Sequence, residues 1–212
     1  MSFAGERAIV VSRYDRVWRG REVRRVHQED TCQALGLPPA SKYQNEGGPS
    51  PERIIELLRS AIREREHAAD AVSRFVDALA FNWVIAGTDA HAKNYSLLLA
   101  GPQVRFAPLY DVASALPYED MYLPRLHMAM RIGGEYRLEA LAGRHWRRFA
   151  ESAGLDPEVL VRRIDELAAQ APAAFAHAAD RPAVKELASD LSSRLADLVA
   201  KRSAQCRRAL IK

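Results

Sequence analysis

The stretch Gly87-Thr88-Asp89-Ala90-His91-Ala92-Lys93-Asn94 decides the fold, because helical spacing stops before it and strand-like spacing starts after it. Downstream, residues 95–99 and 104–106 are predicted to form a hairpin, and a hairpin returns its end to its beginning. Asp111 follows the hairpin and should therefore lie beside Asn94. Upstream, apolar residues at steps of three and four predict a buried helix that Gly87 ends, with the members Val72, Phe75, Val76, Leu79 and Trp83.

The acidic and amide side chains of this stretch have the types and spacing of a phosphoryl-transfer site. Asp89 and Asn94 lie five residues apart, as do the Asp and Asn of a protein-kinase catalytic loop. In that loop the Asp orients the substrate hydroxyl group and the Asn holds Mg²⁺, and a second Asp, here Asp111, completes the metal site. The structural alternative is that all three side chains cap turns, which Asp and Asn do routinely.

Two other side chains of the stretch each have two interpretations. His91 either braces the loop by hydrogen bonding or ligates zinc, and no other His or Cys stands at zinc-site spacing from it. Lys93 either contacts the transferred phosphoryl group as a catalytic residue or is simply exposed to solvent.

The remaining sequence predicts small β-structures in the N-terminal part and helices in the C-terminal part. The β-branched run at residues 7–11 predicts a buried strand that pairs with residues 22–26. A short helix is expected at residues 31–35, and Ser50-Pro51-Glu52 has the cap, proline and early acid of a helix start. Gly47-Gly48-Pro49 lacks the lysine and the flanking elements of a phosphate loop and is interpreted as a structural turn.

The C-terminal third is predicted to be wholly helical after an extended piece at residues 126–131. Helices are expected from Leu138 to Gly154, from Asp156-Pro157-Glu158 onward, over residues 168–179 with a break at Pro172, and from Pro182. The predicted fold class is mainly α with small β-hairpins. Within one domain over residues 1–212, the expected parts are hinge strands (1–30), a catalytic core of helix, catalytic loop and hairpin (50–115), and a helical bundle (135–212).

The composition argues against a membrane-spanning protein, a secreted disulfide-rich protein and a nucleic-acid-binding protein. The 212 residues are 48% hydrophobic, which suffices for a core, and no run of about 18 apolar residues could span a bilayer. The start of the sequence has no secretory signal, and Cys32 and Cys206 make no disulfide framework, so a reducing cytoplasm is expected. The net charge of +4 is too small to indicate direct nucleic-acid binding.

Several ordered motifs together give the sequence a family resemblance. These motifs are Arg13-Tyr14-Asp15-Arg16, His27-Gln28-Glu29-Asp30-Thr31-Cys32-Gln33-Ala34-Leu35-Gly36-Leu37-Pro38, Lys42-Tyr43, Gly47-Gly48-Pro49, Thr88 to Asn94, and Pro108-Leu109-Tyr110-Asp111-Val112. With them, the sequence resembles the HipA family of bacterial serine/threonine kinase toxins. The resemblance extends from about Arg7 to near the C-terminus. This resemblance implies the helical C-terminal lobe of a protein-kinase-like fold.

The resemblance also implies roles for single residues. Asp89 is implied as the catalytic Asp, assisted by Lys93, with Asn94 and Asp111 as the Mg²⁺ ligands. The segment from Val11 to Tyr14 is implied as the hinge whose backbone meets the adenine of ATP. The nucleotide-binding residues are then expected to be Arg13, Tyr14, Asp15 and His91.

The implied activity is transfer of the ATP γ-phosphoryl group to a protein serine with Mg²⁺. Members of the family phosphorylate a protein such as an aminoacyl-tRNA synthetase and are neutralised by a helix-turn-helix antitoxin of the HipB type. The sequence departs from the family pattern because it starts at the hinge. Lys42 is the one lysine before Asp89, no glycine-rich phosphate loop precedes it, and Ser12 stands where an acidic hinge residue is expected.

Missing phosphate contacts lower the expected activity, because one well-placed electrostatic contact is commonly worth about 10²–10³ in rate. We expect a poor kinase that depends on a separately supplied N-terminal lobe. The alternative from another class is a catalytically inactive, truncated HipA-like domain that acts as a toxin–antitoxin interaction module. A metal-dependent phosphohydrolase using Asp89 and Asp111 would need more metal ligands than the sequence offers.

Overall fold

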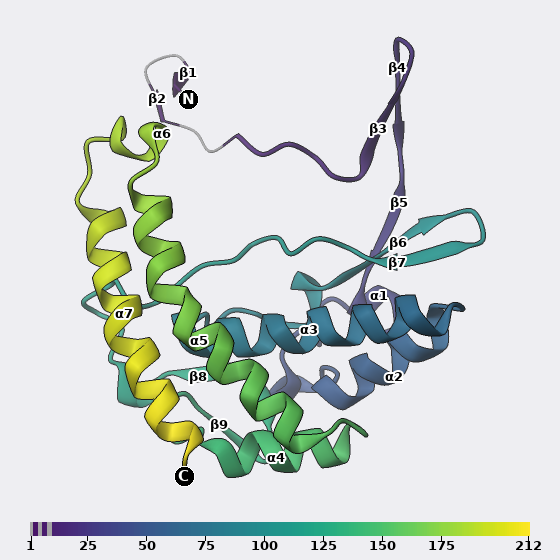
Figure 1. The fold of residues 1–212 in the computed structure, drawn as a ribbon. Helices are drawn as coiled ribbons and strands as arrows, with labels where there is room; N and C mark the ends of the chain where they lie inside the picture. Colours follow the sequence, from purple (N-terminus) through teal and green to yellow (C-terminus); the bar gives the residue numbers. More distant parts are fainter. Residues whose placement is uncertain (1, 4–5, 8–9) are drawn as a thin grey trace.

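Helix α3 (Arg65–Ile85) is the central element of the fold, and helices α2, α5 and α7 pack against it (Figure 1). The structure is a computed structural model that describes residues 2–3, 6–7 and 10–212. One face of α3 carries Phe75, Leu79 and Trp83, each at most 1% exposed. This face confirms the buried helix predicted from the apolar spacing before Gly87.

Aromatic side chains link α3 to both sides of the core. The Phe75 ring meets the Tyr95 ring edge-on, with centroids 4.9 Å apart, and the Trp83 and Trp146 rings lie 5.6 Å apart. The Trp83 indole Nε1 donates a hydrogen bond to the Leu138 carbonyl at 3.0 Å. The core therefore joins α3 both to the hairpin that follows it and to the C-terminal helices.

The C-terminal helices are α4 (Gly143–Ser152), α5 (Pro157–Ala179), α6 (Pro182–Lys185) and α7 (Leu191–Leu210). Helices α5 and α7 lie side by side, and α5 also packs on α3 (Figure 1). Asp156 caps α5 by accepting hydrogen bonds from the backbone of Glu158 and Val159, so the start predicted from the sequence is confirmed. Across the described residues, no helix combines the length and apolar character needed to cross a membrane.

The strands form small antiparallel sheets. The pairs are β1 (Ser2–Phe3) with β2 (Glu6–Arg7), β3 (Arg16–Arg19) with β4 (Glu22–Arg25), and β8 (His127–Ile132) with β9 (Glu135–Arg137). The three-stranded sheet has the order β5 (His27–Asp30), β6 (Ser96–Ala100), β7 (Gln103–Phe106). Short helices α1 (Thr31–Ala34) and α2 (Pro51–Ala61) and 3₁₀ turns at Gln44–Glu46, Ala92–Asn94 and Leu123–Arg125 complete the order.

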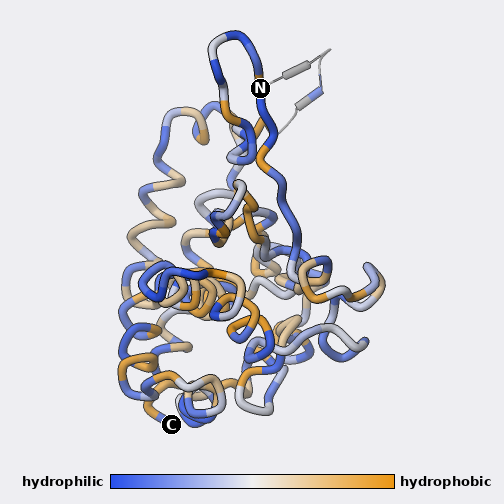
Figure 2. Tube along the Cα trace, turned by 90° about the vertical axis from the view of Figure 1, so that its right-hand side faces the viewer, coloured by the Kyte–Doolittle hydropathy of each residue, from blue (hydrophilic) through white to orange (hydrophobic). Residues whose placement is uncertain are grey.

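The N-terminal strands differ from the prediction. Val10 and Val11 are 55% and 71% exposed and lie outside any strand, so the buried strand predicted at residues 7–11 is wrong there, and Ala8 and Ile9 lie outside the described residues. β4 pairs instead with β3 in a projecting, mostly hydrophilic hairpin (Figure 2). β-Branched residues are buried only where another element packs against them, and the sequence run alone does not supply that element.

Strand β5 was not predicted as a strand, because its residues are polar. It is held by backbone pairing to β6, with Gln28 opposite Leu98 and Asp30 opposite Ser96. This pairing matters for function, since it places the N-terminal segment directly against the hairpin that follows Asn94.

The C-terminal helices correct three details of the prediction. The turn after β9 separates Leu138 from α4, which begins only at Gly143. Helix α5 continues through Pro172, where packing against α7 outweighs the lost backbone hydrogen bond. The last helix is divided into α6 and α7, because Ala188 adopts a left-handed backbone conformation (φ 49°) between them.

Two glycines with the same backbone conformation provide a stability test. A Cβ on Gly133 (φ +52°) would lie 2.0 Å from the His145 carbonyl oxygen, whereas one on Gly101 (φ +61°) would meet nothing within 4 Å. We expect Gly101→Ala to cost about 1–2 kcal/mol through the left-handed conformation. Gly133→Ala should cost about 1–3 kcal/mol more through overpacking. Urea unfolding of both variants measures the difference, and equal losses would contradict the close contact at Gly133.

Candidate active site

The C-terminal end of α3 sets the position of the loop that contains Asp89. Ala86 ends the helix in a left-handed conformation (φ 54°), and the Gly87 amide donates to the Asn82 carbonyl at 2.7 Å. A Cβ on Gly87 would lie 2.2 Å from Asn82 Oδ1 and 3.1 Å from the Ala113 carbonyl oxygen, so a larger residue would require the Asn82 side chain to move. The loop therefore begins at a fixed point on a rigid, buried element.

The N-terminal part of the chain holds the same loop from its other side. The Thr31 hydroxyl donates to the Ala92 carbonyl at 2.7 Å, and the Thr31 amide donates to the Tyr95 carbonyl at 2.9 Å. The Ala92 amide in turn donates to the Lys42 carbonyl at 3.2 Å. Segments distant in sequence thus fix the loop backbone between Asp89 and Asn94.

Asn94 and Asp111 meet at the centre of the site, as predicted from the hairpin. Asn94 Nδ2 donates to Asp111 Oδ2 at 2.9 Å, and Asn94 is 5% exposed. The other amide atom, Asn94 Oδ1, is buried and has no hydrogen-bond partner within the described residues. A buried carbonyl oxygen without a donor is costly unless a ligand completes it. The pair has the oxygen-rich chemistry that Mg²⁺ requires.

Asp111 is held in an unusual backbone conformation. Its φ of 55° lies in the left-handed region, which a non-glycine residue adopts only at a cost. The following segment is tied back to α3, because the Ser114 hydroxyl donates to the Ile85 carbonyl at 2.6 Å and the Ala115 amide donates to the Ala86 carbonyl at 3.0 Å. The same helix end therefore anchors both halves of the site.

The Asp89 side chain is exposed to solvent. Its carboxylate accepts a short hydrogen bond from the Tyr43 hydroxyl. This hydrogen bond, together with burial, raises the pKa of Tyr43 to about 12. Gly48 passes so close to this tyrosine that a Cβ would lie 2.7 Å from the Tyr43 carbonyl, which supports the interpretation of the double glycine as structural.

Lys93 forms an ion pair within the protein. Its ammonium nitrogen lies 2.7 Å from Asp30 Oδ2, and the lysine side chain is 33% exposed. Asp30 also caps α1 by accepting the Gln33 amide at 2.9 Å. Lys93 is thus neither free nor simply exposed, and its contact with a phosphoryl group stays a prediction.

His91 packs by its ring. It lies edge-on to the Tyr43 ring with centroids 5.1 Å apart, and its buried Nδ1 has no hydrogen-bond partner in the described part of the chain. Burial, with the charge of Lys42, lowers the pKa of His91, which favours the neutral imidazole. The ring thus packs against Tyr43, and both the bracing of the loop by a His91 hydrogen bond and a nucleotide contact by His91 stay predictions.

The predicted hinge residues Arg13 and Asp15 bind each other. Asp15 is 1% exposed and accepts hydrogen bonds from Arg13 Nε at 2.8 Å and Arg13 Nη2 at 2.6 Å, as well as from Arg16. These hydrogen bonds, led by that of Arg13, lower the pKa of Asp15 to about 2 against the opposing effect of burial. The Asp15 carboxylate therefore binds arginines at the base of the β3–β4 hairpin, and its contact with a nucleotide stays a prediction.

Tyr14 lies close to Tyr110, the residue before Asp111. Its ring lies 6.4 Å from the Tyr110 ring. The Tyr110 hydroxyl approaches the Ser96 hydroxyl at 2.6 Å and donates a short hydrogen bond to the Lys93 carbonyl. The prediction assigned no site role to Tyr43 or Tyr110, although both stand in the motifs that carry the family resemblance.

Comparison with known proteins places this geometry in a family. Residues 1–175 match the family model for the HipA-like C-terminal domain. The chain belongs to this family. Its fold, mainly α with small hairpins, is the HipA-like kinase-type C-terminal fold that the sequence predicted.

Three relatives show how far the similarity extends. The "Putative kinase Y4mE" of Sinorhizobium fredii is 43% identical over 165 residues, which are 77% of this chain and 38% of that protein. The serine/threonine-protein kinase toxin HipA of Shewanella oneidensis is 28% identical over 184 residues, 82% of this chain and 42% of that protein. A solved complex of Shewanella oneidensis HipA, HipB and operator DNA contains a chain that superposes with a TM-score of 0.78 at 23% identity, covering 94% of this chain and 48% of that one. The HipA-like chain thus spans less than half the length of these relatives.

The Asp15 ion pairs predict an acid-sensitive hairpin. The pKa of Asp15 is lower in the folded state than the usual 3.8, so its stabilisation is complete above about pH 4 and is lost as pH falls through about 2. The Val26 amide donates to the Asp15 carbonyl at 2.9 Å and reports on the hairpin. Its hydrogen-exchange protection, relative to α3 amides, should fall between pH 4 and pH 2 in the native chain.

Two variants control this measurement. In Asp15→Asn the protection of Val26 should be lower at pH 6 and should change little on acidification. Asp70→Asn, which alters a 67% exposed carboxylate on α3, should behave as the native chain does. An equal acid response in Asp15→Asn and the native chain would contradict a role for the Asp15 ion pairs.

The Tyr43–Asp89 hydrogen bond predicts a second titration. Asp89→Ala removes the acceptor, so the pKa of Tyr43 should fall from about 12 toward its usual value of 10. NMR titration of ¹³C-labelled tyrosines measures this shift. Tyr110 is the internal control, since burial is the main cause that raises its pKa to about 12. An unchanged Tyr43 pKa in Asp89→Ala would show that the hydrogen bond is absent in solution.

Proposed function

We propose that this chain is the catalytic C-terminal lobe of a HipA-type serine/threonine protein kinase. The observation that carries the proposal is the hydrogen bond between Asn94 Nδ2 and the Asp111 carboxylate, together with the buried oxygen Asn94 Oδ1, which has no donor within the described residues. Membership of the HipA-like family supports the same activity. Free Cys32 and Cys206 suit a reducing cytoplasm, which we propose as its location.

Asn94 Oδ1 and the Asp111 carboxylate are the groups that would hold Mg²⁺ with ATP. When bound, the ion neutralises negative charge on the ATP phosphates. Asp111 is positioned for this task before any ligand arrives, because the hydrogen bonds of Ser114 and Ala115 tie its segment to α3. A site that is fixed in advance loses little free energy to reorganisation when its ligand binds.

Asp89 is proposed to orient the serine hydroxyl and to accept its proton. The serine oxygen forms the new bond to the γ-phosphorus, the bond from that phosphorus to the bridging oxygen breaks, and ADP leaves. The Tyr43 hydroxyl occupies the Asp89 carboxylate in this structure, so a serine hydroxyl must replace or share that hydrogen bond. Tyr43 is therefore a positioning residue that keeps Asp89 oriented between turnovers.

The partners are also proposals. An N-terminal lobe, in the same polypeptide or a separate one, would supply the phosphate contacts, and exposed Val10, Val11 and Trp18 offer it an apolar surface. A HipB-like helix-turn-helix antitoxin is proposed because the similar Shewanella oneidensis HipA forms a complex with HipB and operator DNA. The proposed substrate is a protein serine, as in an aminoacyl-tRNA synthetase.

Calorimetric titration of Mg²⁺·ATP into the 212-residue chain tests the site directly. We expect binding that Asp111→Ala abolishes, because the variant removes a charged metal ligand. Asp120→Ala removes an exposed carboxylate of the same charge and should leave binding unchanged. Asp89→Ala should also keep binding, and with an added HipA-type N-terminal lobe it should lose phosphoryl transfer by about 10²–10⁴-fold.

Two results would contradict the proposal. Failure of the folded native chain to bind Mg²⁺·ATP would favour the interaction-module alternative. Equal binding by Asp111→Ala and Asp120→Ala would place the nucleotide away from the Asn94–Asp111 pair. Circular dichroism of each variant shows that a loss of binding is not a loss of fold.

A further inference from the structure

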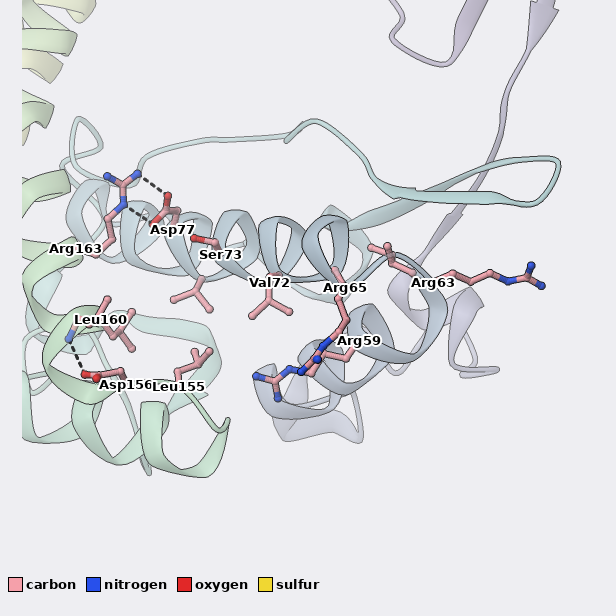
Figure 3. A pocket seen from close by; sticks show the side chains of 15 residues that line it. Arg59, Arg63, Arg65, Val72, Ser73, Asp77, Leu155, Asp156, Leu160 and Arg163 are labelled. Carbon is pink, nitrogen blue, oxygen red and sulfur yellow. Dashed lines mark hydrogen bonds and ion pairs between the residues drawn. The ribbon is translucent and has the colours of Figure 1, made fainter.

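A groove separate from the candidate active site lies between α3, the end of α2 and the start of α5 (Figure 3). Its volume is about 540 Å³, within the range of ligand-binding pockets. No member of the Asp89, Asn94 and Asp111 site lines it. The apolar lining comes from Ile62, Ala68, Ala69, Val72, Val76, Leu155, Val159 and Leu160.

The α3 side of the groove has small and β-branched residues that permit close approach. Ala69 is exposed, whereas Val72 and Val76 beneath it are each 4% exposed. The stretch from Ala68 to Val76 extends about 12 Å along the helix axis. A short segment with apolar side chains at helical spacing matches this length and shape.

The two ends of the groove differ in charge. At one end, Arg163 and Asp77 neutralise each other through two hydrogen bonds, of 3.1 and 2.8 Å. At the other end lie Arg59 and Arg65, and Arg63, which also lines this end, extends its side chain away from the groove (Figure 3). Arg59 donates only to the Ala153 and Gly154 carbonyls, and in the described part of the chain no ion pair joins any of these three arginines to a carboxylate.

We propose that this groove binds an acidic, amphipathic segment of a partner protein. Its apolar side chains would cover the apolar face of α3 that lines the groove. Its carboxylates would pair with Arg65, and with Arg63 once that exposed side chain turns toward the groove. Charge complementarity selects the occupant, since a guanidinium offers carboxylates a planar fork of donors. Arginine beside buried apolar residues is also the composition of energetically important protein interfaces.

Fluorescence anisotropy with a labelled helical probe tests the proposal on the full chain. The probe has leucines at helical spacing and glutamates at one end, and a matched probe carries lysines instead. We expect the glutamate probe to bind at least tenfold more tightly than the lysine probe. We also expect this preference to shrink at high salt, because exposed charges are screened.

Three variants locate the binding. Arg63→Glu with Arg65→Glu should weaken the glutamate probe about tenfold or more. The matched control, Arg144→Glu with Arg208→Glu, reverses two other exposed charges and should have little effect. Ala69→Trp should block the groove without changing its charge. Circular dichroism and Mg²⁺·ATP titration check that every variant keeps its fold.

The proposal is overturned by any of three results. These are no binding of the glutamate probe, equal binding of the two probes, or equal weakening by the groove and control variants. Binding of oleate, an apolar acid, without binding of the glutamate probe would also overturn it, because the groove would then be a small-molecule pocket. None of these results depends on kinase activity.

Discussion

The structure depends on one constraint, namely the way in which α3 ends. Backbone carbonyls that a helix leaves unpaired at its C-terminus need other donors. Here Ser114 and Ala115 supply them to Ile85 and Ala86. The donors that complete the helix are thus the residues that hold the Asp111 segment, while Gly87 sends the chain the other way into the Asp89 loop. The hydrogen bonds that complete the end of α3 thus also anchor the Asp111 segment.

This arrangement explains how the protein maintains two unfavourable local features. Asp111 has a strained backbone, and Asn94 buries a carbonyl oxygen that lacks a donor among the residues that the structure describes. Each costs free energy, and such features persist where the surrounding packing over-determines them and a ligand gains from them. The aromatic contacts of Phe75 with Tyr95, just after Asn94, supply part of that packing.

Much of the fold follows from local sequence rules. The spacing of apolar residues predicted α3, the capping residues predicted the starts of α2 and α5, and the hairpin predicted the approach of Asp111 to Asn94. Those features depend on neighbours in sequence. Strand β5 and the Tyr43–Asp89 hydrogen bond depend on partners 46 or more residues away, which no local pattern reveals. The buried strand predicted at residues 7–11 was wrong for the converse reason. The hydrophobicity of Val10 and Val11 suggested that another element covers them, and the described structure places none there.

The distribution of positive charge around the site limits what this chain can do to ATP by itself. Phosphates need cations, and in the described residues Lys93 is already paired with Asp30, and Arg13 and Arg16 with Asp15. Lys42 lies 4.8 Å from the centre of the Tyr43 ring and has no carboxylate partner within the described chain. Under the proposed function, charge on the phosphates would therefore be neutralised by Lys42, by a bound metal ion and by groups outside the described residues. The described site therefore offers carboxylate and amide oxygens, but few cations that are free of a carboxylate partner.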